Sequence, residues 1–121
     1  MPIERIIPNV QAADSAATAA FYSDFVGLVV DMEMPEDDFV MMSSPAVTSA
    51  QITINDNGFR GLPPGFAVDV GSADEVSTLH DRALSTGLRI VEPLEDKPWG
   101  IRRFSVLDPS GNRVTIVAHT G

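Results

Sequence analysis

The sequence contains no cysteine. Disulfide bridges and thiolate chemistry are therefore excluded, and a cytoplasmic location is the simplest expectation. Long apolar runs are also missing, since the longest aliphatic stretch, residues 25–30, is far shorter than the roughly 20 residues that a membrane helix needs. The opening stretch MPIERIIPNV places Glu4 and Arg5 before any apolar run, which argues against a signal peptide and for a protein without a membrane partner.

Basic residues are scarce as well. The chain has 8 Lys and Arg against 17 Asp and Glu, which gives a formal net charge of −9 at pH 7. Such a surface repels phosphate backbones, so we expect no nucleic-acid partner and favour cationic or neutral ones. The acidic side chains gather in one run, where they form either a solvated hairpin tip or an attractive surface for a cation. This run comprises Asp31, Glu33, Glu36, Asp37 and Asp38.

Aromatic residues make up only 7% of the chain, and the single tryptophan lies in an unusual place. Trp99 stands between Pro98 and Gly100 in the stretch DKPWGIRRF, and both neighbours favour turns over helix or strand interiors. A lone tryptophan usually fills the core. Here, either the loop covers the core or the ring faces something that is not protein.

The 121 residues suit one domain, and the sequence repeats itself within it. Three matches lie about half the chain apart: VQAAD (10–14) with VGSAD (70–74), Gly27 with Gly87, and ITI (52–54) with VTI (114–116). The first two matches have a spacing of 60 residues. We therefore predict a single domain of two copies of one module, with module one at about 1–57, a linker at about 58–64 and module two at about 65–121.

Each module begins with a short strand followed by a helix. In module one, Asp14 or Ser15 can cap the helix, and Gly27 is placed to end it. The four-residue spacing of Ala17, Phe21 and Phe25 predicts that these side chains form the apolar inner face.

The helix of module two has clearer signals. Ser72 with Glu75 forms a capping box, and Gly87 follows the last turn. Its predicted inner face comprises Val76, Leu79 and Ala83.

Three strand-like runs follow each helix. The predicted strands are 28–34, 39–43 and 50–55 in module one, and 88–92, 101–107 and 112–118 in module two. The last two are joined by DPSG, with proline at a favoured turn position. The fold class is therefore α+β, with tandem βαβββ modules.

Two motifs mark a resemblance to a known superfamily. FYSDFVGL (21–28) and DPSGNRVTI (108–116), within a tandem βαβββ of this length, resemble the vicinal-oxygen-chelate superfamily. That group includes glyoxalase I, extradiol dioxygenases, fosfomycin-modifying enzymes and bleomycin-resistance proteins. The resemblance covers almost the whole chain and implies a curved mixed sheet around a crevice. It leaves the chemistry open, because one scaffold hosts several functions.

The resemblance also locates the superfamily's metal positions. Metal-dependent members carry His, Gln or Glu ligands on the first and fourth strands of each module. The corresponding positions here are Ile7, Thr53, Gly65 and Thr115. None of these side chains supplies the imidazole or carboxylate that divalent metals prefer. We therefore expect no metal and no cofactor.

Further motifs resemble the metal-free bleomycin-resistance branch: EDDF (36–39), PWG (98–100) and DPSGN (108–112). In that branch the matching phenylalanine and tryptophan sandwich a flat ligand in a crevice between two subunits, and a proline matching Pro8 is the hinge of a swapped first strand. The resemblance thus implies a homodimer with a strand hinge at Pro8. The ligand-binding residues that we predict are Phe39, Trp99, Asp37, Asp38, Gly100 and Arg102.

Three functions remain open. The first is a binding protein without catalytic residues that sequesters a flat, cationic antibiotic. The second is a metal-independent lyase or isomerase of the glyoxalase type, with Asp69 or Glu92 as the base. The third is a dimeric structural or regulatory module. Arg102 and Arg103 could instead bind an anionic substrate, and Phe39 and Trp99 could simply belong to the core.

Overall fold

The computed structural model describes residues 3–56 and 62–121. The chain divides into two compact units. We call Ile7–Pro64 the N-terminal unit, and Met1–Ile6 together with Gly65–Gly121 the C-terminal unit. The predicted linker, residues 58–64, lies largely outside the described residues.

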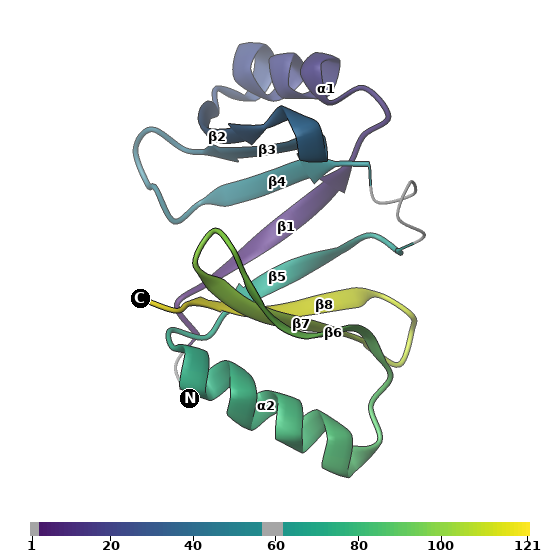
Figure 1. Ribbon diagram of the computed structural model, residues 1–121. Helices are drawn as coiled ribbons and strands as arrows, with labels where there is room; N and C mark the ends of the chain where they lie inside the picture. Colours follow the sequence, from purple (N-terminus) through teal and green to yellow (C-terminus); the bar gives the residue numbers. More distant parts are fainter. Residues whose placement is uncertain (1–2, 57–61) are drawn as a thin grey trace. The chain divides into compact units, whose positions relative to one another are not determined.

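The N-terminal unit has the predicted order of elements (Figure 1). Its elements are β1 (Arg5–Gln11, which begins in the C-terminal unit), α1 (Ser15–Phe21), a π-helical turn η1 (Tyr22–Val26), β2 (Val29–Met34), a 3-10 turn η2 (Pro35–Asp37), β3 (Phe39–Ser43) and β4 (Gln51–Asn55). The strands lie in the order β2-β3-β4-β1. β1 and β4 run parallel and the other neighbours antiparallel, so the sheet is mixed as predicted.

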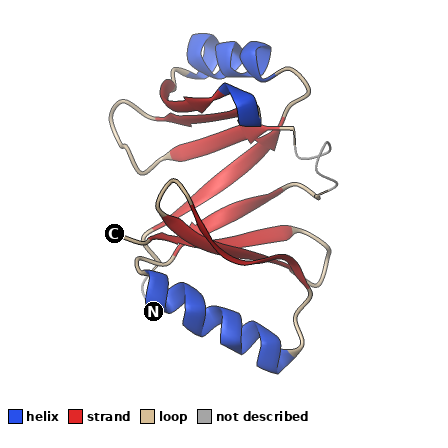
Figure 2. Ribbon diagram, viewed as in Figure 1, coloured by secondary structure: helices blue, strands red, loops and turns tan. Residues whose placement is uncertain are grey.

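The C-terminal unit repeats this arrangement (Figure 2). Its elements are β5 (Gly65–Asp69), α2 (Ala73–Thr86), β6 (Ile90–Lys97), β7 (Ile101–Leu107) and β8 (Arg113–His119). The strand order is β5-β8-β7-β6, again with one parallel pair, β5 and β8. The α+β class and the tandem βαβββ order are therefore confirmed, whereas the crevice and the strand-swapped dimer stay predictions.

The helix ends follow the sequence signals. Asp14 accepts a hydrogen bond from the backbone N–H of Ala17, and Ser72 accepts one from that of Glu75. The two helical segments end at Gly27 and Gly87, both in the left-handed conformation. Ser72 is thus the structural counterpart of Asp14, and the sequence match of Asp14 with Asp74 was wrong by two residues.

One face of each sheet packs on its own helix. In the C-terminal unit, α2 lies along the sheet (Figure 1), and the predicted inner residues of α2 join the core. This core comprises Val68, Val70, Val76, Ala83, Phe104, Val106 and Ala118, with Leu79 packed against it. In the N-terminal unit the core comprises Ala12, Val40, Met42 and Ile54.

The prediction for the first helix was wrong in its phase. Phe21 and Phe25 are 53% and 81% exposed, and their rings stack on each other at 5.5 Å. Ser15 is buried, and Ala19 and Tyr22 pack against the core instead. These three also have helical spacing, i, i+4 and i+7. The sequence offers both phases, and the observed one places the small side chains of Ser15 and Ala19, followed by Tyr22, against the sheet.

Strand β6 is longer than the predicted 88–92 because it continues through Glu92 to Lys97. This segment contains Pro93 and several charged residues, which are poor signals for a central strand. At the edge of the sheet both are tolerated, because an edge strand needs no partner on one side and charges there discourage unwanted pairing.

Candidate ligand-binding site

The sheet of the C-terminal unit has a polar face opposite its helix. Side chains alternate along a strand, so Phe104 and Val106, which pack in the core beside α2, direct Arg103 and Ser105 to the other side. We call that side the helix-free face. It is where chemistry-bearing residues of this unit come together.

Three side chains form a hydrogen-bonded row across the helix-free face. Strand register places Thr115 opposite Ser105, and Ser105 opposite Glu92. The fully buried Ser105 hydroxyl donates to Glu92 Oε1 at 2.7 Å and lies 2.8 Å from Thr115 Oγ1. Since the single hydroxyl proton of Ser105 is directed to Glu92, Thr115 must be the donor in the second bond. The row therefore ends on a carboxylate.

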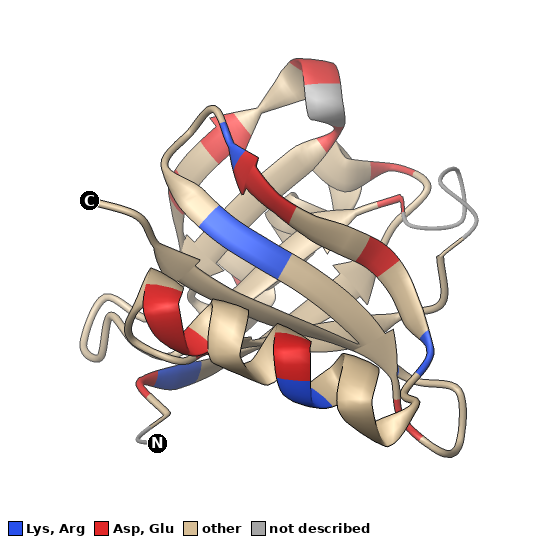
Figure 3. Ribbon diagram, turned by 60° about the horizontal axis from the view of Figure 1, so that its bottom comes forward, with Lys and Arg blue, Asp and Glu red and all other residues tan. Residues whose placement is uncertain are grey.

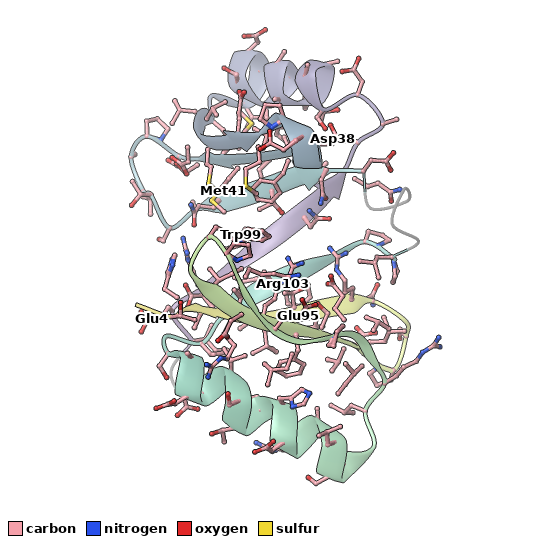
Figure 4. The ribbon with its side chains drawn as sticks, in the orientation of Figure 1. Glu4, Asp38, Met41, Glu95, Trp99 and Arg103 are labelled. Atoms are coloured by element: carbon pink, nitrogen blue, oxygen red, sulfur yellow. The ribbon has the colours of Figure 1, made fainter. Side chains whose placement is uncertain are left out.

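Arg103 connects this carboxylate to the tryptophan. Its Nη2 lies 3.6 Å from Glu92 Oε2, and its guanidinium carbon lies 6.0 Å from the centre of the Trp99 ring. The second distance is within the range of a cation–π contact. The Glu92 and Arg103 side chains are only 18% and 21% exposed, so the contact is partly shielded from water. Figure 4 shows Arg103 on the sheet and Trp99 at the hairpin end.

The β6–β7 hairpin explains why a tryptophan stands between proline and glycine. The N–H of Gly100 donates to the carbonyl of Lys97 at 3.0 Å, which closes a four-residue turn with Pro98 at its second position and Trp99 at its third. Gly100 has φ +89°, a conformation that other residues rarely adopt. Trp99 is 47% exposed and lies outside the core of its unit. The turn therefore presents the ring instead of burying it.

Arg102 lies on the opposite face from Arg103. Its guanidinium donates two hydrogen bonds to the Asp96 carboxylate, at 2.7 and 3.2 Å, and a third to Ser77 on α2 at 3.0 Å. The hydrogen bonds between the two side chains hold the pKa of Asp96 below its ordinary value and raise the pKa of Arg102. Figure 3 shows the basic residues of β7 beside the acidic residues of β6. The structure thus places Arg103 at Trp99 and Arg102 beside α2, and ligand binding by Arg102 stays a prediction.

The other predicted plate, Phe39, belongs to the N-terminal unit. It opens β3 and alternates with the core residues Val40 and Met42, so it lies on the side of its sheet that faces away from α1. Asp38 precedes it with φ +52°, and its Oδ1 accepts a hydrogen bond from Ser15 at 2.7 Å. The side chain of Asp37, which is also a predicted ligand-binding residue, lies outside the part of the chain that the structure describes. Asp38 thus ties the hairpin to the start of α1.

Pro8 lies near the point where β1 passes from one unit to the other. The division falls between Ile6 and Ile7. Before it, Glu4 donates its N–H to the carbonyl of Asp69 at 2.8 Å, and Arg5 Nε lies 3.0 Å from Asp69 Oδ2. A hinge at Pro8 stays a prediction. Asp69, one of the two candidate bases, is buried and engaged in these structural contacts.

The positions that correspond to metal ligands do not fit a metal. Ile7 is buried and aliphatic. A side chain on Gly65 would collide with the backbone of Arg113, whose carbonyl carbon lies 2.7 Å from the position of an added Cβ. Thr53 accepts a hydrogen bond from Asn9 Nδ2 at 2.8 Å, and Thr115 is bonded to Ser105. Within residues 3–56 and 62–121, no cluster of three or more His, Asp or Glu could hold a metal ion.

The sequence indicates Glu92 only as a possible base and Thr115 only as a position that corresponds to a metal ligand, and it gives no role to Ser105. The available signal is the alternation in Arg103, Phe104 and Ser105, in which a large apolar residue separates two polar ones. Such alternation predicts one buried and one polar face. It does not reveal that a carboxylate of the edge strand β6 lies opposite, because the register of β6 is shifted by irregularities on both sides of Glu92.

Comparisons with known proteins agree with this fold. A sequence model described as "Glyoxalase/Bleomycin resistance protein/Dioxygenase superfamily" matches residues 5–116. A crystal structure of a member of that superfamily from Vibrio splendidus 12B01 has a TM-score of 0.73 and 20% identity, covering 97% of this chain and 99% of the other. Methylmalonyl-CoA epimerase from Mycobacterium tuberculosis has a TM-score of 0.65 and 17% identity, covering 98% and 88%.

The Mn(II)-bound glyoxalase from Novosphingobium aromaticivorans has a TM-score of 0.66 and 17% identity, covering 96% of this chain and 38% of the other. At these identities the likeness shows the fold alone. No match was found among curated proteins. No helix in the described residues is long and apolar enough to cross a membrane.

Proposed function

Because the chain belongs to the glyoxalase/bleomycin resistance protein/dioxygenase superfamily, we propose that it is a metal-independent protein that binds a flat, cationic small molecule. The observation that supports this proposal most is the half-exposed Trp99, held at a hairpin turn beside the Arg103–Glu92 pair. An aromatic ring with one available face and a nearby carboxylate suits a planar cation, since the ring offers stacking and the carboxylate offers charge pairing.

The charge distribution supports a cationic ligand. Between Ile6 and Phe59 the sequence contains acidic residues and no Lys, Arg or His. The resulting negative potential raises the local concentration of cations and the rate at which they are captured. An anionic ligand would be disfavoured by the same field.

The finer parts of the proposal follow the bleomycin-resistance branch. The ligand is an antibiotic that the protein sequesters without converting it, in the cytoplasm. Phe39 provides a second aromatic plate in a crevice shared by two subunits of a homodimer, whose first strands are exchanged about Pro8. The dimer and the hinge at Pro8 are tested separately from the binding itself, by sedimentation.

Titration of the single tryptophan tests the proposal. Bleomycin is added to the wild-type protein, and the emission of Trp99 is followed together with the melting temperature. We expect quenching or a spectral shift, and, at a ligand concentration of a hundred times Kd, about 2.7 kcal/mol of stabilisation. Trp99→Ala should remove the binding and cost little stability, because the ring lies outside the core.

The opposite pattern would overturn the proposal. If Trp99→Ala destabilises the fold by about 3–5 kcal/mol, as large core truncations do, and no planar cation changes the emission, then the tryptophan has a packing role. Tyr22→Ala is the control for the loss of stability that a core truncation causes, because Tyr22 packs against the core of the N-terminal unit.

A second candidate function rests on the row that ends at Glu92. A carboxylate that receives a serine hydroxyl, itself bonded to a threonine hydroxyl, could move a proton from a carbon acid in a metal-independent isomerase or lyase. Turnover of a panel of α-keto, thiol-adduct and aromatic substrates in the presence of chelator tests this candidate. Activity that Glu92→Gln abolishes and Asp69→Asn retains would favour it over sequestration.

A further inference from the structure

Arg103 makes the two contacts that a planar cationic ligand would make in this site. Its guanidinium lies over the Trp99 ring, and one of its nitrogens lies 3.6 Å from the Glu92 carboxylate. On the premise of the proposed binding function, we propose that Arg103 is an internal occupant of the cation position. The ligand group that replaces it is a planar amidinium or guanidinium attached to an aromatic ring.

The neighbouring charges single out Glu92 as the acceptor. On the same edge strand, Glu95 lies opposite Arg103 in register, but its carboxylate pairs with Lys97 Nζ at 3.3 Å. Asp96 points to the other face and is engaged by Arg102. Glu92 Oε1 is held by Ser105, and its Oε2 faces Arg103. The Ser105 bond fixes the carboxylate while leaving one oxygen directed toward the cation.

The geometry selects the chemistry of the ligand. A guanidinium is planar and delocalised, so it stacks on an aromatic face and directs N–H groups to a carboxylate at the same time. An amidinium on an aromatic ring shares both properties. An alkyl ammonium is a compact, strongly hydrated charge that cannot lie flat on the ring. We therefore expect the site to prefer aryl amidines to benzylamine-type cations of the same charge.

To bind the wild-type protein, the ligand must first displace the Arg103 side chain from its position, and this displacement weakens the binding. A ligand binds only to the fraction of molecules in which its position is vacant, and the apparent Kd rises in proportion. The Arg103 side chain is held by one cation–π contact and one ion pair, both of modest strength at a partly exposed site. Removing it should tighten the binding of an aryl amidine about tenfold.

Titration calorimetry with p-aminobenzamidine tests the inference. Arg103→Met keeps an apolar stem of similar length and removes the charged group. We expect it to bind the probe about tenfold more tightly than the wild type, whereas Glu92→Gln binds more weakly. Arg82→Met is the matched control, because Arg82 is an exposed residue of α2, which packs on the other face of the sheet, and the affinity of this variant should equal that of the wild type. Arg103→Gln, measured in parallel, should also bind more tightly and covers the case in which Arg103→Met fails to fold.

The outcomes separate this inference from the proposed function. If the wild type binds p-aminobenzamidine and both Arg103 variants bind equally or more weakly, the internal-occupant role is wrong while cation binding stands. If 4-aminobenzoate binds and Arg103→Met abolishes that binding, Arg103 is an anion receptor and the inference is overturned. If no variant binds bleomycin or the amidine, both the inference and the proposed function fail.

Discussion

Gly65→Ala tests the close approach of β5 to β8. The same approach leaves no room for a side chain at position 65, which corresponds to a metal-ligand position of the superfamily. A Cβ at Gly65 would fall on the carbonyl group of Arg113, with the carbonyl carbon at 2.7 Å and the Arg113 Cβ at 2.9 Å. Both atoms belong to the neighbouring strand and cannot rotate away. The two strands must therefore separate by roughly 1 Å at this end, which carries their hydrogen bonds beyond good geometry.

The expected cost follows from those bonds and from the overpacking. Each weakened backbone hydrogen bond costs about 0.5–1.5 kcal/mol, and forced overpacking in tight regions costs about 1–3 kcal/mol. We therefore expect Gly65→Ala to lower the free energy of unfolding by about 2–4 kcal/mol in urea titrations. Gly121→Ala is the neutral control, because nothing lies within 4 Å of its added Cβ. Gly100→Ala should cost about 1 kcal/mol, since its φ of +89° is strained for alanine without any clash.

A small effect would contradict the close approach of the strands. If Gly65→Ala changes the free energy of unfolding by less than about 0.5 kcal/mol, the scatter of ordinary surface substitutions, β5 and β8 are further apart than the structure places them. In that case a ligand side chain could be accommodated at position 65, and the case against a metal there would rest on Ile7 and the threonines alone.

Four further outcomes are expected. Phe25→Ser should change the free energy of unfolding by less than about 0.5 kcal/mol, whereas Tyr22→Ala should cost about 2 kcal/mol or more in the same urea titration, because only Tyr22 packs against the core. By carboxyl NMR, Asp96 should titrate at a lower pH than an ordinary aspartate, and Arg102→Met should return its pKa to the ordinary range. Because the pKa of Asp96 is lowered in the folded state, the stabilisation from the pair is present above the unfolded-state pKa and is lost as the pH falls through the folded-state pKa. Elemental analysis should find no stoichiometric metal, and chelator should leave the melting temperature unchanged; one tightly bound ion per subunit would contradict this. Sedimentation should show a dimer that Pro8→Ala loosens, and a monomer at micromolar concentration would remove the shared crevice.

Local signals in the sequence predicted the order of elements well. Capping residues and glycines fix helix ends through contacts a few residues away, so Asp14, Ser72, Gly27 and Gly87 could be assigned without tertiary information. The strands at 39–43 and 101–107 match β3 and β7, because their alternation is regular and both lie inside a sheet. Where the structure is determined locally, the sequence suffices.

The first helix and the edge strand were harder for a physical reason. The segment 15–26 carries two apolar phases, and the choice between them depends on which side chains the sheet can accept. Strand β6 is held by its pairing with β7, not by its own propensity. In both cases tertiary contacts override the local pattern.

The candidate site illustrates the same limit at the level of single side chains. Trp99 and Gly100 were recognisable because a Pro–Trp–Gly turn is unusual. The sequence does not show which of Arg102 and Arg103 faces α2, because adjacent residues on a strand face opposite ways and only the register decides between them. Arg102 therefore forms an ion pair with Asp96, whereas the next residue, Arg103, contacts Trp99.

The two modules also differ across matching rows of their sheets, and this difference concentrates the chemistry in one of them. In the C-terminal unit the row runs Thr115, Ser105 and Glu92. In the N-terminal unit, Thr53 lies opposite Met41, and Met41 opposite Met32. Threonine is common to both rows, whereas a hydroxyl and a carboxylate in one are replaced by two thioethers in the other. Methionine side chains are flexible and polarisable and adapt to irregular apolar surfaces, but they cannot pair with a charge. The same repeat therefore carries a charge-bearing row in one copy and an adaptable apolar row in the other, and of these two rows only the first contains a carboxylate that can pair with the cationic group that we propose.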